Sequence, residues 1–420
     1  MRDLVLLALL AYGTLYALRE PWIGTMIWTN VSLMSPHAQF GNAAGEWPVA
    51  TGVALTTMIG LVMHRDKAEN PLRGAPAMAI LAFTFWITFT LPFSIYFDDS
   101  FPLWVRSMKI FLMLFVTIAL LTDKRKINVF VAVMTFSIAF YGIKGGMFTL
   151  ATAGSYRVWG PGGFIGGNNE LALALIMTIP MMRYLQLQVT NKWLSRGLTF
   201  GMAMTAVTVL GTYSRGALLG LSAMAIFLWI KSPKKLGMGL VLVLGGALAL
   251  GFMPEQWWDR MHTIKTYNAD ESALGRINAW WNAFHVANDR PFGGGFMIYM
   301  PEVFARYAPD PNDVHAAHSI YFQVLGEHGW IGLLVFVSIG ALTWRDAGRL
   351  SRLTRNRPEL RWAGELGVMT QVAMVGYAVA GAFLSLAYYD FPYNQAAAIV
   401  AAYAIVRKQL AAARKPVPTL

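Results

Sequence analysis

Long apolar runs constrain this chain more than any other feature of its sequence. Eleven segments are apolar over most of their length, at about residues 48–64, 76–97, 102–121, 127–149, 169–186, 196–211, 215–231, 235–252, 318–344, 364–388 and 392–406. Runs of this length suit the hydrocarbon core of a bilayer, where only a helix satisfies its own backbone hydrogen bonds. The composition agrees, with 56% hydrophobic and 13% charged residues. We therefore predict an all-α, polytopic transmembrane protein.

The N-terminal region decides the number of spans. Residues 4–35 hold two shorter apolar pieces, separated by Arg19-Glu20-Pro21. Neither piece alone comfortably crosses a hydrocarbon layer of roughly 30 Å. One broken crossing gives about twelve spans with the N-terminus inside, whereas two crossings give thirteen with the N-terminus outside. We favour twelve, and because no small-residue cleavage site follows the first apolar piece, we predict a retained span instead of a secretory signal.

Basic residues set the orientation. They gather in alternate connections and at the C-terminus, at Arg65/Lys67/Arg73, Lys124/Arg125/Lys126, Lys192/Arg196, Lys231/Lys234/Lys235, Arg345 to Arg361, and Arg407/Lys408/Arg414/Lys415. The positive-inside rule places this set in the cytoplasm, so the net charge of +12 reflects topology and not affinity for nucleic acid. The predicted organisation is then helices in 1–252, a long outer loop at 253–317, three helices in 318–406 and a cytoplasmic tail at 407–420.

Several charged residues break this rule by lying near the outer surface. They are Arg106, Lys109, Lys144, Arg157, Arg215 and Arg276. Ionisable groups at membrane depth tend to mark function, and clustered basic groups favour an anionic ligand such as phosphate. Snorkelling to lipid headgroups is the alternative, above all for Arg106 and Lys109. It is weaker for Arg215, because Ser214-Arg215-Gly216 opens a helix whose free N–H groups also favour an anion.

The long outer loop contains one predicted helix, at Ser272–Asn288. Its apolar stripe is formed by Leu274, Ile277, Trp281 and Phe284, and Arg276 and Trp280 lie on the neighbouring face. Asn288-Asp289-Arg290-Pro291 ends this helix, and Gly293-Gly294-Gly295 is predicted to act as a flexible joint. The loop's tryptophans are typical of a membrane–water interface.

Two histidines close the loop, and three interpretations compete for them. His315 and His318 could bind a metal together with Asp310 or Asp313, could serve only as polar residues at a helix start, or could supply a general base. We favour the base, at His318, because neutral imidazole accepts a proton near physiological pH and His318 stands where the loop meets the membrane.

The loop at 150–168 ends just before another apolar helix. There Asn169 is a candidate cap, and Glu170 either holds an arginine in place or only complements the helix end. The chain has no cysteine, which excludes disulfides and thiol catalysis.

Four motifs together resemble the O-antigen ligase family, which shares a domain with O-antigen polymerases. They are Asn168-Asn169-Glu170-Leu171-Ala172, Tyr213-Ser214-Arg215-Gly216-Ala217, Gly275-Arg276-Ile277-Asn278-Ala279-Trp280, and the stretch from His318-Ser319-Ile320-Tyr321 to Gly326-Glu327-His328-Gly329. The resemblance covers roughly residues 120–390. The chain also resembles the O-glycosylation ligases associated with exosortase systems.

The resemblance implies a GT-C-like, metal-independent glycosyltransferase without a cofactor, at the periplasmic face of the bacterial inner membrane. The donor would be a glycan on undecaprenyl pyrophosphate, and the acceptor lipid A–core. His318 would be the general base, and Arg215 and Arg276 would bind the pyrophosphate. A single displacement would invert the anomeric carbon.

We assign the other outer residues to substrate binding: Arg157, Lys144, Arg106, Lys109, Asn169, Glu170 and His315. An O-antigen polymerase and a protein O-oligosaccharyltransferase are the nearest alternatives. A transporter or flippase of lipid-linked glycans would instead carry charges near the bilayer midplane and an internal repeat, and no repeat is evident.

Overall fold

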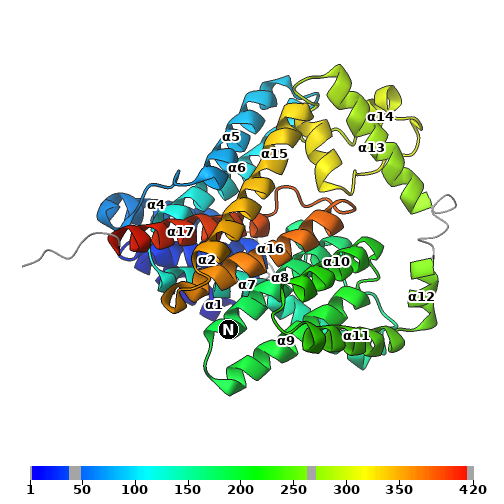
Figure 1. Cartoon of the computed structure of the whole chain (residues 1–420). Helices are drawn as coiled ribbons and strands as arrows, with labels where there is room; N and C mark the ends of the chain where they lie inside the picture. The colour runs from blue at the N-terminus through cyan, green and yellow to red at the C-terminus, as the bar shows by residue number, and fades with distance from the viewer. Residues whose placement is uncertain (1, 37–48, 263–270, 414–420) are drawn as a thin grey trace, which may run out of the picture.

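Helices form the regular structure of this chain in the computed structural model, which describes residues 2–36, 49–262 and 271–413 (Figure 1). Those residues contain sixteen α-helices and several short 3-10 turns, and no strand among them. The all-α prediction is therefore confirmed for the described residues. Parts of two predicted segments, 263–270 of the long loop and 414–420 of the tail, lie outside them.

Every predicted apolar segment contains a helix. The helices are α1 (Arg2–Tyr16), α2 (Pro21–Met34), α4 (Val49–Met63), α5 (Ala75–Thr90), α6 (Phe97–Leu120), α7 (Lys124–Ala151), α8 (Asn168–Gln188), α9 (Lys192–Gly211), α10 (Arg215–Lys231), α11 (Lys235–Gly251), α12 (Glu255–His262), α13 (Glu271–Asp289), α14 (Pro301–Tyr307), α15 (Ile320–Leu353), α16 (Arg361–Gly381) and α17 (Asp390–Ala412). The N-terminal region is broken where predicted, since α2 starts at Pro21, which has no N–H to lose at the first helical position.

Five of the described helices are long and apolar enough to cross a membrane by themselves. They are Ala75–Phe93, Phe97–Leu120, Lys124–Ala151, Asn168–Gln188 and Ile320–Leu353. A sixth is added if Lys235–Gly251 and Glu255–His262, which meet at 109°, are counted as one span. The chain is thus a multi-pass membrane protein, and the count of twelve remains a prediction. Helix α17 is not among these candidates, and it carries the buried polar residues Asp390, Asn394 and Gln395.

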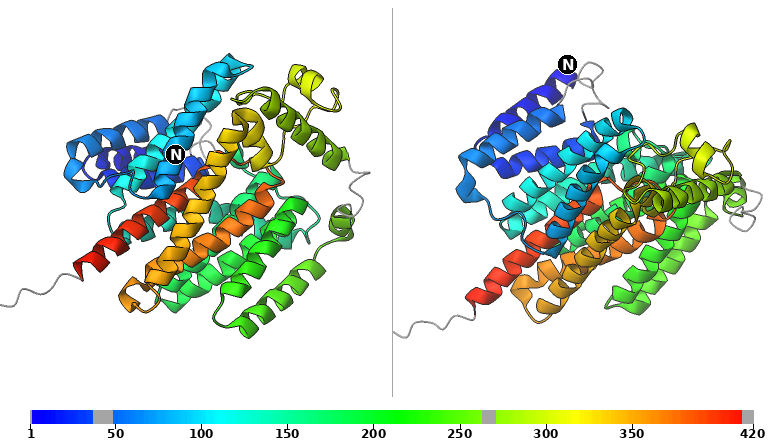
Figure 2. Two further views of the ribbon diagram at one scale, coloured as in Figure 1. Left: turned by 45° about the horizontal axis from the view of Figure 1, so that its top comes forward. Right: turned by 90° about the horizontal axis from the view of Figure 1, so that it is seen from above.

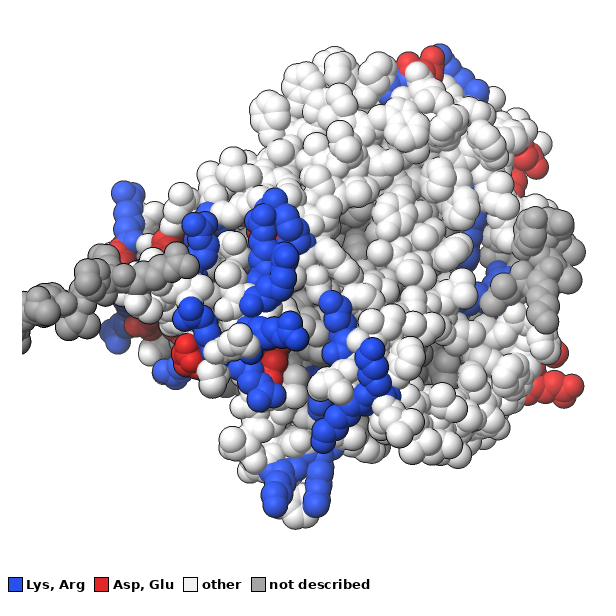
Figure 3. All heavy atoms as spheres, in the orientation of Figure 1, with Lys and Arg blue, Asp and Glu red and all other residues white. Residues whose placement is uncertain are grey.

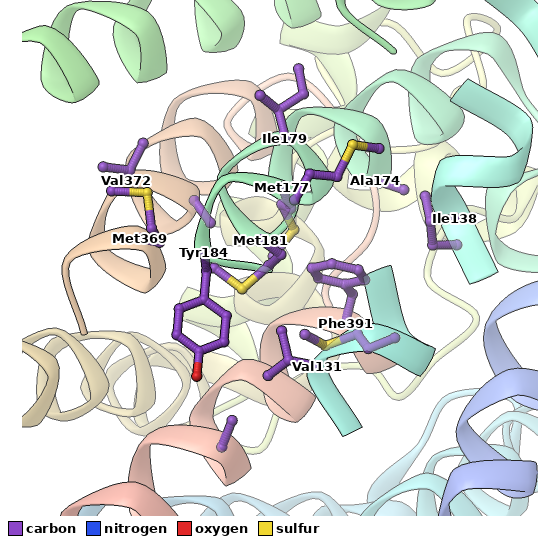
Figure 4. Close-up of a cluster of buried hydrophobic side chains, with 14 of the residues drawn as sticks. Val131, Ile138, Ala174, Met177, Ile179, Met181, Tyr184, Met369, Val372 and Phe391 are labelled. Atoms are coloured by element: carbon purple, nitrogen blue, oxygen red, sulfur yellow. The ribbon is translucent and has the colours of Figure 1, made fainter. Parts of the chain in front are cut away.

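The core of the molecule is centred on α8. This helix is buried from Leu171 to Leu185 except at Arg183, and it packs against α7, α9, α10 and α16. Figure 4 shows how its side chains, such as Met177 and Tyr184, meet Val131 of α7, Val372 of α16 and Phe391 of α17. A helix that is apolar on all sides is stable only inside other structure, which explains why α8 lies in the centre.

The long helix α15 is interrupted at Gly329, whose φ of 70° and ψ of −174° are not helical. The segment Gly293–Gly295 packs against this break, where the amides of Gly294 and Gly295 donate to the carbonyls of Gly326 (2.9 Å) and Glu327 (3.0 Å). A Cβ on Gly293 would lie 2.4 Å from the Glu327 carbonyl oxygen. The prediction of a flexible joint is therefore wrong: the glycines allow a close backbone contact that ties the end of α13 to α15.

The helix predicted at Ser272–Asn288 is present as α13, and with α14 it lies beside the beginning of α15 in Figures 1 and 2. Its predicted apolar stripe is not its buried face, since Leu274 and Trp281 are 44% and 48% exposed. The buried side is formed by smaller and polar residues: Gly275, Asn278, Ala279, Asn282, Ala283, Val286 and Ala287. Small side chains let α13 approach α15 closely, a requirement that hydrophobic periodicity does not register.

Candidate active site where α10, α13 and α15 begin

His318 sits in a strained backbone conformation immediately before α15. Its φ is +43°, in the left-handed region that non-glycine residues rarely adopt. Ser319 caps α15 by accepting the amide of Phe322 at 3.5 Å, so the helix begins directly after the histidine. Strain of this kind costs about 1–3 kcal/mol, persists only where neighbouring structure holds it, and concentrates at functional sites.

Trp280 of α13 supplies part of that support. Its indole Nε1–H donates to the carbonyl of Ala317, the residue before His318, at 2.6 Å. Its ring is stacked on Phe322, with centroids 5.0 Å apart and planes within 6°, and its centroid lies 6.4 Å from that of Phe383. Trp280 therefore fixes both the peptide that precedes His318 and the first turn of α15.

Asn278 and Gly275 hold the segment that leads to His318. The Asn278 side-chain amide donates to the carbonyls of Asp310 (2.8 Å) and Asp313 (2.9 Å) and accepts the amide of Asp310 (2.9 Å). A Cβ on Gly275 would lie 2.8 Å from Nδ1 of His315, the atom that is 2.7 Å from Oδ1 of Asp313. The motif from Gly275 to Trp280 thus positions the loop as well as Arg276.

His318 is neutral at physiological pH. Partial burial, then the nearby charges of Arg276 and His315, lower its pKa from the ordinary 6.5 to about 4. Its Nδ1 is buried and has no hydrogen-bond partner among the described residues. A neutral imidazole is suited to accept a proton from a substrate.

Arg215 is the first residue of α10, placed by an equally constrained turn. Ser214 caps the helix by accepting the amide of Ala217 at 3.2 Å, and Tyr213 has a φ of +59° and donates its hydroxyl to the Gly154 carbonyl at 2.6 Å. A Cβ on Gly216 would lie 2.8 Å from Cβ of Phe383, the side chain that also faces Trp280. Phe383 therefore connects the start of α10 to α13.

The beginning of α8 joins the same region. The Asn168 side chain donates to the Thr212 carbonyl at 2.7 Å, and Glu170 lies near enough to Arg276 for that charge to act on its carboxylate. Its carboxylate also accepts a hydrogen bond from its own backbone N–H at the helix start, so both interpretations of Glu170 remain open. Asn169 is not the helix cap as predicted, because Gly167 occupies the N-cap position and has no side chain to accept a hydrogen bond.

The remaining predicted residues differ in whether they lie beside the candidate site. Arg157 is exposed, with its guanidinium carbon 5.7 Å from the ring centroids of both Trp159 and Tyr213, and so lies beside the Arg215 turn. Arg106 covers the ring of Phe164 at 3.5 Å. Lys109 and Lys144 are exposed on α6 and α7.

The described residues contain no group of three or more His, Asp or Glu side chains placed to hold a metal together. Figure 3 shows Lys and Arg atoms at the right of the molecule, between the level of α13 above and α10 below in Figure 1. The arrangement thus offers guanidinium groups and a neutral imidazole, which suit an anionic substrate and proton transfer.

Sequence reasoning missed Phe383, which belongs to no motif and follows α16. It also gave no role to a buried polar cluster at the break of α15, although Glu327 and His328 are part of a quoted motif. There Glu327 accepts the Tyr388 hydroxyl at 2.5 Å, and Nδ1 of His328 is 3.1 Å from Oγ1 of Thr90. The sequence did contain a signal for this cluster, because polar residues stand inside a predicted apolar segment.

Comparisons with known proteins match two parts of the chain. Residues 1–190 match a family of unknown function (DUF5935), and residues 200–337 match the family described as O-Antigen ligase. No curated protein matches the chain. The second match contains Arg215, Arg276 and His318. Residues 200–337 therefore carry an O-antigen ligase domain, and the family to which this domain is assigned consists of membrane enzymes of the ligase and polymerase type that transfer lipid-linked glycans.

Proposed function

We propose that the protein is an O-antigen ligase, which transfers a glycan from undecaprenyl pyrophosphate to a sugar hydroxyl of lipid A–core. The observation that carries this proposal is the junction built by Trp280 and Phe383. Their contacts bring together the segments that bear His318, Arg276 and Arg215. A glycan transferase with a pyrophosphate leaving group needs this combination of a base and cations.

We place the site at the periplasmic face of a bacterial inner membrane, in a chain that crosses it about twelve times in a GT-C-like arrangement. Helix α15 supports this orientation, since beyond its break at Gly329 it runs away from α13 and α14 to Arg345, Arg349 and Arg352. In Figure 3 most Lys and Arg atoms of the visible face gather at the lower left and centre, away from α13 and α14. Excess positive charge marks the cytoplasmic side.

The proposed reaction is a single displacement. The acceptor hydroxyl attacks the anomeric carbon while its proton passes to the imidazole of His318. The bond from that carbon to the pyrophosphate oxygen breaks, and its electron pair stays on the pyrophosphate, where Arg215 and Arg276 stabilise the developing charge. Attack opposite the leaving group inverts the anomeric carbon. Because pyrophosphate leaves readily, neither a metal nor a general acid is required.

Donor binding should also strengthen the base. The charge of Arg276 contributes to the low pKa of His318. A bound pyrophosphate offsets that charge, so the imidazole becomes a better proton acceptor once the donor is in place. The same charge that keeps His318 neutral in the empty site thus couples proton transfer to the presence of the leaving group.

We assign the other predicted residues supporting roles. Arg157, on the exposed side of the Arg215 turn, and His315, 44% exposed in its side chain, are placed to contact the glycan. Glu170 orients Arg276, and Asn169 lies in the first turn of α8 beside it. Arg106, Lys109 and Lys144 are left for membrane lipids or the outer part of the donor.

The test is transfer by the purified protein, offered lipid A–core, a second lipid-linked glycan and a protein acceptor in separate reactions. Product on lipid A–core supports the ligase, product only on the second glycan identifies a polymerase, and glycosylated protein identifies an oligosaccharyltransferase. A flippase gives no covalent product. His318→Ala should abolish turnover while donor binding is retained, whereas Arg215→Ala and Arg276→Ala should weaken donor binding or departure of the pyrophosphate. Full activity of the His318 variant would exclude it as the base.

A further inference from the structure

A partly open pocket lies where α8, α10 and α15 end, at the opposite end of these helices from the candidate site. It has a volume of about 1180 Å³ and is lined by the end of α8, the turn between α10 and α11, and the turn between α15 and α16. Typical small-molecule pockets hold about 300–1,000 Å³. This pocket is therefore large enough for a sizeable ligand, and the proposed transfer reaction gives it no role.

The lining of this pocket is strongly cationic. Its basic residues are Arg183, Lys231, Lys234, Arg355, Arg357 and Arg361, against the single carboxylate of Glu365. That carboxylate already accepts hydrogen bonds from Nε of Arg361 and from Nε2 of Gln188, both at 2.7 Å. Within the described part of the chain, Lys231, Lys234, Arg355 and Arg357 form no ion pair, and all four are exposed. These four basic side chains are therefore not neutralised by a carboxylate and can bind an anion.

Two helix N-termini add to this positive potential. Helix α11 begins after Lys234 and α16 begins after Leu360, and neither helix has a side-chain cap. The first turns of both helices line the pocket through Gly237 and Arg361. The first N–H of α16, that of Arg361, already donates to the Pro358 carbonyl, so the two N-termini favour a negatively charged group mainly through their helix dipoles.

Apolar side chains form another part of the wall. Leu187, Leu228, Val241, Val368 and Met369 come from α8, α10, α11 and α16. A soluble anion would gain nothing from contact with these apolar side chains. A lipid, in contrast, can place its phosphates among the basic side chains and its acyl chains along the apolar helices. The positive-inside rule explains the sign of the charges but neither the cavity nor its apolar side.

We infer that this pocket binds an anionic phospholipid that carries two phosphodiester groups. The phosphates lie between the two turns, one near each helix N-terminus, and the acyl chains extend along the apolar wall. Basic pockets between transmembrane helices at the cytoplasmic side are suited to such headgroups. This site is independent of the proposed glycan transfer and would stand if that proposal failed.

The experiment titrates the delipidated, full-length protein in detergent with cardiolipin, which has two phosphodiesters, and reads bound lipid by native mass spectrometry. The pocket variant Lys234→Gln/Arg355→Gln/Arg357→Gln should lower the affinity for cardiolipin at least tenfold. The matched control, Arg65→Gln/Arg125→Gln/Arg407→Gln, removes the same charge from exposed positions at the basic end but outside the pocket. It should change the affinity less than twofold.

Two comparisons separate the sources of the phosphate. Zwitterionic phosphatidylethanolamine should bind at least tenfold more weakly than cardiolipin, and inorganic pyrophosphate should fail to displace bound cardiolipin. Equal losses in the pocket and control variants, or displacement by pyrophosphate at similar concentrations, would overturn the inference. Thermal unfolding of both variants checks that they are folded, and the single change Arg357→Gln, expected to weaken cardiolipin binding severalfold, replaces the triple variant if that is unstable.

Discussion

The hydrogen bond from Trp280 to the peptide before His318 allows a sharp test of how the site is held. The change Trp280→Phe removes the Nε1–H that reaches the Ala317 carbonyl at 2.6 Å, and it keeps an aromatic ring to stack on Phe322. One hydrogen bond contributes about 0.5–1.5 kcal/mol net. His318 meanwhile stores left-handed strain of about 1–3 kcal/mol that its surroundings must hold.

If loss of this hydrogen bond displaces His318 at an equal cost, the activation free energy of the transfer step rises by the free energy of the bond, and kcat falls accordingly. At about 1.4 kcal/mol per factor of ten, 0.5–1.5 kcal/mol corresponds to roughly twofold to thirteenfold. The KM for the lipid-linked donor should not change, because Trp280 is proposed to act through His318 and is a positioning residue. The assay is steady-state glycan transfer with purified protein, with kcat and KM determined separately.

The neighbouring change Trp281→Phe is the control. Trp281 is 48% exposed, and its ring contacts only Phe284 and His285 among described aromatic residues. It should leave kcat within a factor of two. A Trp280→Phe enzyme with unchanged kcat, or one in which only the donor KM rises, would refute the positioning role.

Three further outcomes are expected. The acid limb of kcat/KM should lie near pH 4 and not near 6.5, because His318 acts as a base only when unprotonated and its lowered pKa keeps it so down to about 4; Arg276→Gln should move that limb to higher pH. A limb at 6.5 in both enzymes would contradict this reading. Ser214→Ala should lower the free energy of unfolding by about 1 kcal/mol through loss of the α10 cap, measured by thermal unfolding. Gly293→Ala, at φ +74° and 2.4 Å from a carbonyl, should destabilise the protein clearly, whereas Gly245→Ala, with open space around it, should not; equal melting temperatures would argue against the contact at the α15 break.

Hydrophobic patterning located the helices well because helices in a bilayer leave a long apolar signal. It recovered α13 inside the outer loop, but it chose the wrong face of that helix. Leu274 and Trp281 are large and apolar, yet the buried face of α13 carries small residues such as Gly275 and Ala283, and a Cβ on Gly326 of α15 would lie 2.9 Å from Cβ of Ala283. Close packing selects small residues there, and their weak hydrophobicity hides the contact from a periodicity argument.

The candidate site, too, was predictable from the sequence only in part. Arg215, Arg276 and His318 were found from their types and places: cations on the side that the positive-inside rule leaves neutral, and a histidine where a polar loop meets a helix. The low pKa of His318 had no signal in the sequence, because it depends on burial and on Arg276, which lies 42 positions earlier. Phe383 had none either, since an aromatic residue after an apolar helix is ordinary.

The sequence by itself determined that this is a helical membrane protein, where its helices lie and which residues are candidates for chemistry, because these properties follow from local composition and short motifs. Only the tertiary structure decided that α10, α13 and α15 meet at Trp280 and Phe383, and that six cations from three separate segments surround one pocket at the other end. Both arrangements depend on side chains far apart in the chain approaching within a few ångströms. The packing of whole helices sets such distances, and no local pattern records them.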